Sequence, residues 1–127
     1  MVELSLISKD YTPEMALASN DIVKQGVVTT NVERLDQFII NTNNNVPDKV
    51  RIIDYGIDSP LYTILEYNED YIIMTTKHIL HDEPRYNTYY GNRINKRYRQ
   101  KFNRTILYYN LIQFDNNEVP IISVQLD

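Results

Sequence analysis

The sequence contains no cysteine and only three glycines among its 127 residues. The absence of thiols excludes disulfide bonds, thiolate zinc sites, iron–sulfur clusters and cysteine nucleophiles. Three glycines leave little material for a backbone loop around phosphates, and the chain has no dinucleotide fingerprint and no nucleophile-elbow motif. These absences disfavour an enzyme, and we expect no cofactor.

Long hydrophobic runs are also missing. No stretch approaches the roughly 18 consecutive apolar residues that a membrane-spanning helix needs. The first residues include Glu3 where a signal peptide would carry basic residues, and no long apolar core follows. We therefore expect a cytoplasmic protein as the chain is written, and a secreted or lipid-anchored one only if an export signal has been removed.

Length and composition indicate one folded domain. The apolar fraction of 43% is enough to fill the single core of a chain of this length. We expect one domain over residues 1–127, with an N-terminal arm of about residues 1–11. Trp is absent and Ala occurs only twice, whereas Tyr, Ile and Asn are abundant. Because Tyr and Ile fit pleated surfaces, the composition favours sheet over helix.

Two segments near the N-terminus are typical of helices. Thr12, Pro13 and Glu14 combine a capping hydroxyl, a proline at the first helical position and an acid in the first turn. This helix is expected to run to about Val23 and to stop before Gly26. A second helix is expected from residue 32 to about 41, capped by Asn31. Its apolar stripe repeats at intervals of three and four and consists of Val32, Leu35, Phe38 and Ile39.

Strand composition predominates after the second helix. Residues 49–57, 61–67 and 71–76 are rich in β-branched and aromatic residues and are separated by turn signals, which predicts a three-strand antiparallel meander. Residues 105–114 and 119–126 resume this composition and flank a four-residue hairpin loop. Residues 77–103 show no sustained period, and we expect a long basic and aromatic excursion over residues 77–104.

These elements predict an α+β fold. The helices precede all the clear strands, and the connections between strands are too short for the crossover helices of a parallel sheet. We therefore expect an antiparallel sheet of about five strands, covered on one face by the N-terminal helices.

Several short motifs between residues 20 and 76 occur in a familiar order. They include Asn20-Asp21-Ile22-Val23, Leu35-Asp36-Gln37-Phe38, Asp48-Lys49-Val50-Arg51-Ile52, Tyr55-Gly56-Ile57 and Leu65-Glu66-Tyr67-Asn68. With Gly26 and Asn31 between them, they resemble the small Bacillus-type proteins grouped as domain-of-unknown-function family 4362. The resemblance implies no activity and no ligand. It also implies an export signal and a cysteine near the end of the domain, and this chain shows neither.

Acidic and histidine side chains offer two weak candidate sites. His78 and His81, followed by Asp82 and Glu83, could present two imidazoles and carboxylates to a divalent metal. The spacing arises easily by chance, and no third histidine exists. Asp54 with Glu66 on neighbouring strands, and Glu69 with Asp70 at a turn, could act as carboxylate pairs, but solvated acids on the outer face of the sheet and at a hairpin tip explain them better.

Charge is concentrated in one segment. Residues 85–104 hold seven basic and no acidic side chains, whereas the rest of the chain holds six basic and all 17 acidic ones, for a net charge of −4. Tyr86 and four further aromatic residues lie among the cations. The candidate binding residues are Arg85, Tyr89, Tyr90, Arg93, Lys96, Arg97, Tyr98, Arg99, Lys101, Phe102 and Arg104.

Two roles fit this segment. Tyr and Arg dominate binding hot spots, and exposed cations attract carboxylates or phosphates. Alternatively, the aromatic residues anchor a loop while the cations contact the acids of the same molecule. Because the chain as a whole is acidic, an acidic protein partner is a better prediction than a nucleic acid. We therefore expect a non-enzymatic binding or inhibitory module, with a nucleic-acid-binding protein and a metal-dependent hydrolase as the alternatives.

Overall fold

The computed structural model describes residues 4, 7, 11–56, 59–80 and 83–126. In chain order its elements are α1 (Pro13–Ala18), β1 (Ile22–Gln25), β2 (Val28–Thr30), α2 (Val32–Asn43), β3 (Asp48–Tyr55), β4 (Pro60–Tyr67), β5 (Ile72–Leu80), β6 (Glu83–Lys101), β7 (Arg104–Gln113) and β8 (Glu118–Gln125).

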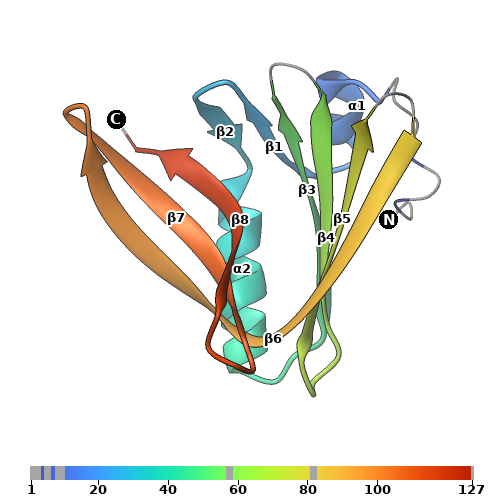
Figure 1. Ribbon diagram of the computed structural model, residues 1–127, viewed down its shortest axis with the longest axis vertical. Helices are drawn as coiled ribbons and strands as arrows, with labels where there is room; N and C mark the ends of the chain where they lie inside the picture. Colours follow the sequence, from blue (N-terminus) through green and yellow to red (C-terminus); the bar gives the residue numbers. More distant parts are fainter. Residues whose placement is uncertain (1–3, 5–6, 8–10, 57–58, 81–82, 127) are drawn as a thin grey trace.

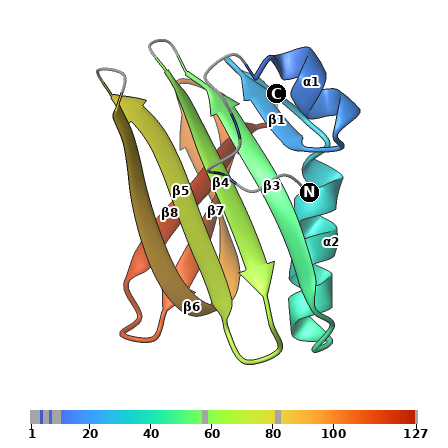
Figure 2. The ribbon, with the colours of Figure 1, turned by 90° about the vertical axis from the view of Figure 1, so that its right-hand side faces the viewer.

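The eight strands form one sheet in the order β2-β1-β3-β4-β5-β6-β7-β8. All neighbouring pairs are antiparallel except β1 and β3, which run parallel. The chain between these two contains β2 and α2, which supplies the crossover that a parallel pair requires. Figures 1 and 2 show that the sheet is curled, with α2 along one side of the space between its two halves.

The sheet changes direction within β6. Residues of β6 up to Gly91 pair with β5, and those from Gly91 onward pair with β7. A register shift between Gly91 and Arg93 leaves Asn92 as an extra residue, and such bulges bend a strand. The first wing is defined as the sheet from β2 to Gly91. The second wing comprises residues 93–101 of β6 together with β7 and β8 (Figure 1).

The inner faces of both wings pack around α2. Leu35 and Phe38 on α2 are fully buried, and Val32 and Ile39 of the same stripe are partly buried. Their cluster collects apolar side chains from both wings, including Ile22, Val50, Ile52, Leu65, Ile72, Met74, Leu107, Tyr109, Leu111, Ile122 and Val124. The principal core therefore lies inside the curl.

The outer face of the first wing is covered by α1 and by N-terminal residues. The buried ammonium of Lys77 donates to the backbone carbonyls of Leu4 and Ile7, at 3.0 and 2.7 Å. Next to α1, Arg51 Nε lies 2.9 Å from Asp21 Oδ2, and both side chains are almost fully buried. No described helix covers the outer face of the second wing (Figures 1 and 2).

The predicted α+β class, with a mostly antiparallel sheet that predominates over helix, is confirmed. Residues 49–57, 61–67 and 71–76 correspond to β3, β4 and β5, which are adjacent as expected, and the second helix packs its apolar stripe against the sheet. The remaining two predicted strands correspond to β7 and β8. The prediction of about five strands is wrong, because β1, β2 and β6 lie in segments where no strand was expected. The prediction that helices cover one face of the sheet is also wrong for the first wing, because α2 packs on its inner face and α1 on its outer face.

The first helix is shorter than its prediction. It ends at Ala18, and Asn20 has a φ of 63°, which turns the chain before β1. Ile22 and Val23 are buried in two different clusters, on opposite faces of the sheet, which a strand allows and a helix does not. Asn31 occupies the cap position of α2, but its side chain makes no capping bond and instead donates to Asn20.

Residues 77–103 are strand and not an irregular excursion. They contain the end of β5, all of β6 and the turn at Phe102 and Asn103, although residues 81 and 82 lie outside the described part. Most side chains of residues 93–101 are exposed on both faces of the second wing. The sequence therefore lacks the apolar alternation by which a half-buried strand is recognised.

None of the described helices is long and apolar enough to span a bilayer.

We predict that Gly91→Ala destabilises the protein by about 2 kcal/mol, within the range of overpacked cores. A Cβ at Gly91 would overlap the carbonyl oxygen of Ile112 and would lie 2.7–2.8 Å from side-chain carbons of Leu111. Gly56→Ala is the control, because its Cβ would lie 3.5 Å from the nearest atom, an ordinary contact. Chemical denaturation measures both variants, and equal stability of the two would contradict the steric role of Gly91.

Candidate binding surface on the second wing

A row of cations projects from the outer face of β6 in the second wing. Side chains alternate between the two faces of a strand, and Ile94 packs against the inner cluster together with its cross-strand partner Leu111. The odd-numbered positions of this part of β6 therefore face outward. We call the following residues the outward row: Arg93, Arg97, Arg99 and Lys101.

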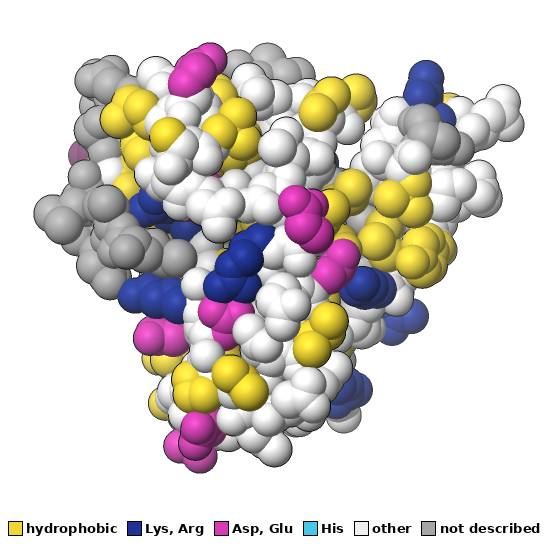
Figure 3. All heavy atoms as spheres, turned by 180° about the vertical axis from the view of Figure 1, so that it is seen from behind, with side chains coloured by type: hydrophobic (Ala, Val, Ile, Leu, Met, Phe, Trp, Pro, Cys, Tyr) yellow, Lys and Arg dark blue, Asp and Glu magenta, His cyan; other side chains and the backbone are white. Residues whose placement is uncertain are grey.

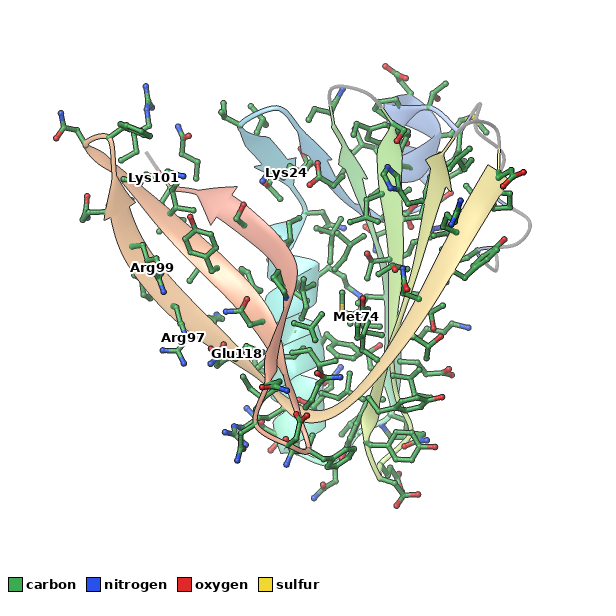
Figure 4. All side chains as sticks on the ribbon, in the orientation of Figure 1. Lys24, Met74, Arg97, Arg99, Lys101 and Glu118 are labelled. Atoms are coloured by element: carbon green, nitrogen blue, oxygen red, sulfur yellow. The ribbon has the colours of Figure 1, made fainter. Side chains whose placement is uncertain are left out.

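The outward row is exposed, and its last three members occupy every second position of the strand. All four side chains belong to exposed residues, and Figure 4 shows Arg97, Arg99 and Lys101 in succession along β6. Positions two apart on a strand lie about 6.7 Å from each other. Arg104 lies directly opposite Lys101 in the β6–β7 register and extends the row at its end. Seen from behind in Figure 3, Lys and Arg side chains lie along the right-hand lobe, which is the second wing.

The outer face of the second wing has one carboxylate among its described strand residues, that of Glu118 on β8 (Figure 4). Glu118 Oε1 accepts from Arg97 Nε at 2.8 Å and from Asn95 Nδ2 at 2.6 Å. These hydrogen bonds, that of Arg97 first, hold the pKa of Glu118 below its ordinary value. Glu118 therefore stays ionised and neutralises Arg97.

The other members of the outward row have no carboxylate partner in the described part of the chain. Arg93 and Arg99 form no ion pair there, and the ammonium of Lys101 lies 5.9 Å from the ring centroid of Phe102. Exposed cations held on one face repel one another and attract an external anion. The arrangement can therefore bind negative charge.

Lys96 lies on the opposite face of β6. Its ammonium is 2.7 Å from Asp36 Oδ1 on α2 and 5.4 Å from the ring centroid of Tyr109. The hydroxyl of Tyr109 donates to the same carboxylate oxygen at 2.8 Å. Burial and the neighbouring Asp36 carboxylate raise the pKa of Tyr109, which keeps it a donor. This cluster attaches α2 to the second wing.

The structure divides the predicted binding residues into separate groups. Arg85 lies on the first wing, opposite His78. Tyr89 packs against the inner core. The ring of Tyr90 contacts that of Tyr71 edge-to-face, with 5.7 Å between the ring centroids. These three therefore do not join the outward row.

The exposed aromatic residues of the second wing lie beside the row. Tyr98 is on the inner side of β6 and 65% exposed, and Phe102 is 87% exposed in the turn that follows. The aromatic residues thus flank the cations instead of alternating with them on one face.

Asn95 and Glu118 are the residues of this surface that sequence reasoning missed. The sequence did contain a signal that these cations share one face of a strand, because arginines and a lysine recur at every second position from 97 to 101. Glu118 is 21 positions from Arg97, and only the register of β6, β7 and β8 brings the two together.

The candidate metal ligands are only partly described. His78 lies on β5, and its Nε2 is 2.5 Å from Ser59 Oγ, which occupies one ring nitrogen. His81 and Asp82 lie outside the described residues. Within the described part, no group of three or more His, Cys, Asp or Glu side chains could hold a metal ion.

The candidate carboxylate pair is not assembled. Asp54 lies opposite Leu61, whereas Glu66 lies opposite Lys49 near the other end of the same two strands. Five strand positions separate the two levels, or roughly 17 Å. The two carboxylates therefore do not form a pair, because the antiparallel register holds them apart.

A separate hollow of about 480 Å³ lies beside the ends of β1 and β3. It is lined by Lys24, Gly26, Asp54, Tyr55 and Gly56. Lys24 (labelled in Figure 4) donates to Ser123 Oγ at 2.9 Å and so connects β1 to β8 across the curl. Its ammonium is therefore already engaged in the structure.

One family model matches the chain, over residues 19–106, and its description is "Domain of unknown function (DUF4362)". The match includes all of β6 and ends within β7. No curated protein and no solved structure matches this chain.

We predict that Arg97→Met raises the pKa of Glu118 toward its ordinary value, because the substitution removes the principal hydrogen bond that favours the ionised carboxylate. Titration of the carboxyl carbon by NMR measures the change. Arg93→Met is the control, since Arg93 makes no hydrogen bond to Glu118. A Glu118 titration that is the same in wild type and Arg97→Met would contradict the pairing.

Proposed function

The chain belongs to the DUF4362 family, which is described only as a domain of unknown function, and on that premise we propose that it is a non-enzymatic binding module for an acidic protein. The binding surface in this proposal is the outer face of the second wing. The residues that bind are the outward row, extended by Arg104.

The observation that carries the proposal is the placement of the outward row. Its cations share one exposed strand face on which Glu118 is the one described carboxylate, although the chain has more acidic than basic residues overall. Intramolecular neutralisation accounts for Arg97 and for Lys96, which pair with Glu118 and Asp36. Among the described residues neither Arg93 nor Arg99 forms an ion pair, although the charge of Arg99 also acts on Glu118. In this proposal both charges bind the partner.

An acidic protein fits this surface better than a nucleic acid. The net charge of −4 means that the rest of the molecule repels a long polyanion, whereas a carboxylate-bearing segment need only contact the second wing. Single-stranded nucleic acids also bind through aromatic platforms on which bases stack. In this molecule Tyr89 is partly buried in the core and Tyr90 contacts Tyr71. The exposed Tyr98 and Phe102 lie on the inner side of β6 and in the turn, off the face that carries the cations.

We predict that Arg93→Gln combined with Arg99→Gln weakens binding of a fluorescently labelled polyglutamate segment, short enough to contact the second wing alone, about tenfold. Each exposed charge pair contributes up to about 1 kcal/mol, and tenfold corresponds to about 1.4 kcal/mol. Wild-type affinity should also fall steeply as salt is raised through the physiological range, because exposed charges are screened over about 8 Å there. Fluorescence anisotropy measures both effects.

The matched control combines Arg85→Gln with Lys96→Gln, which removes the same charge from the same strand but not from the outward row. Its affinity for polyglutamate should stay within about twofold of wild type, because Arg85 lies on the first wing and Lys96 is already paired with Asp36. Equal weakening by the two double variants would contradict the proposal. So would tighter binding of a single-stranded oligonucleotide with the same number of charges, which would indicate nucleic-acid binding instead. Thermal melting verifies that both variants are folded.

A further inference from the structure

One edge of β6 in the second wing has no neighbouring strand. The ladder between β5 and β6 ends where Ile72 lies opposite Gly91, and beyond that point β6 pairs only with β7. Among the described residues, no other backbone group bonds to the β5 side of residues 93–101. Figure 1 shows the β6–β7 hairpin projecting away from the first wing. We call this side of residues 93–101 the open edge.

The backbone groups that point to the open edge can be identified. The carbonyl of Thr105 accepts from Leu126 N at 2.9 Å, on the side of β7 that faces β8. Thr105 therefore does not share backbone bonds with Gln100, the residue opposite it on β6. Because bonded and non-bonded pairs alternate along an antiparallel ladder, the N–H and C=O groups of Tyr98 and Lys96 point to the same side as those of Gln100. The same alternation puts the backbone groups of Ile94 on this side, and Lys96, Tyr98 and Gln100 are the three such residues farther from the bulge.

The other two edges of the sheet are protected. β2 is only three residues long, and β8 contains Pro120 beside a shift in its register with β7. Short strands, prolines and bulges are the usual means of preventing unwanted strand pairing. The open edge has none of these three over residues 93–101, and its protection against unwanted pairing is the charge of its side chains.

We propose that the open edge binds an extended acidic segment of the partner protein by strand addition, with Asp or Glu at every second position of that segment. This inference rests on the proposed function and specifies the form of the partner. An added strand places alternate side chains on the outer face, where acidic ones would lie beside Arg93, Arg97, Arg99 and Lys101. Backbone bonds to Lys96, Tyr98 and Gln100 would supply affinity that charge alone does not.

A second copy of this chain is a poor occupant of the open edge. Pairing two such edges would place the outward row of one molecule directly against that of the other. Like charges opposite one another destabilise a ladder. The cations therefore exclude self-association at the edge while they admit an acidic strand.

The test uses a ten-residue peptide with Glu at alternate positions and Thr or Val between, together with the same peptide N-methylated at alternate residues. Methylation on the bonding side removes donors and blocks strand pairing but leaves all charges in place. The unmethylated peptide should bind at least tenfold more tightly. In amide hydrogen exchange by NMR, it should slow exchange at Lys96, Tyr98 and Gln100, whose N–H groups have no strand partner in the free protein.

A pair of protein variants tests the edge from the other side. Tyr98→Pro removes one edge N–H that the β6–β7 ladder does not use, and such positions tolerate proline. Tyr98→Ala is the control, because it removes the same ring and retains the N–H. Tyr98→Pro should bind the unmethylated peptide at least fivefold more weakly than Tyr98→Ala, with comparable melting temperatures.

The outcomes separate the two proposals. Equal binding of the two peptides, or binding without slowed exchange at the three edge amides, overturns strand addition and leaves charge recognition by the outward row intact. Failure of both peptides and of polyglutamate to bind overturns the proposed function, and strand addition with it.

Discussion

The close approach of β6 to the Ile112 carbonyl at Gly91 is the steric constraint on which the two-winged structure depends. Only a residue without a side chain lets β6 leave β5 at this point, gain one extra residue and continue as the partner of β7. The bend turns the inner face of the second wing toward α2, where Tyr109 and Lys96 meet Asp36. The same bend leaves the open edge of β6 without a neighbouring strand.

The two wings differ in what covers them, and this difference determines where charge is available. On the first wing Asp21 pairs with Arg51 next to α1, and Asp48 accepts two hydrogen bonds from Arg34. The hydrogen bonds that Asp48 receives outweigh its partial burial and lower its pKa. Asp21 and Asp48 are thus used internally, whereas the outer face of the second wing has one carboxylate, Glu118, among its described strand residues.

The sequence was sufficient to predict those elements whose apolar pattern is produced by the core. The stripe of Leu35 and Phe38 predicted α2, and the β-branched runs predicted β3 to β5, because each buries one face against the inner cluster. β6 could not be predicted in this way, because residues 93–101 bury almost no side chains. The turn that follows has Phe102 and Asn103 at positive φ, without the glycine that usually indicates a hairpin. The cations of the candidate site were identified from the sequence. Their division between two faces of a strand depends on the bend and the register, which residue types alone do not encode.

The strand order also has a kinetic consequence. From β3 to β8, each strand pairs with the next one in the chain through a short connection, so these contacts are local and require little loop closure. The parallel pair of β1 and β3 joins Ile22 to Ile52 across β2 and α2. We expect the meander to form first and to act as the template on which β1 and α2 then dock. The N-terminal third of the chain, although synthesised first, would thus be the last part of the protein to become native.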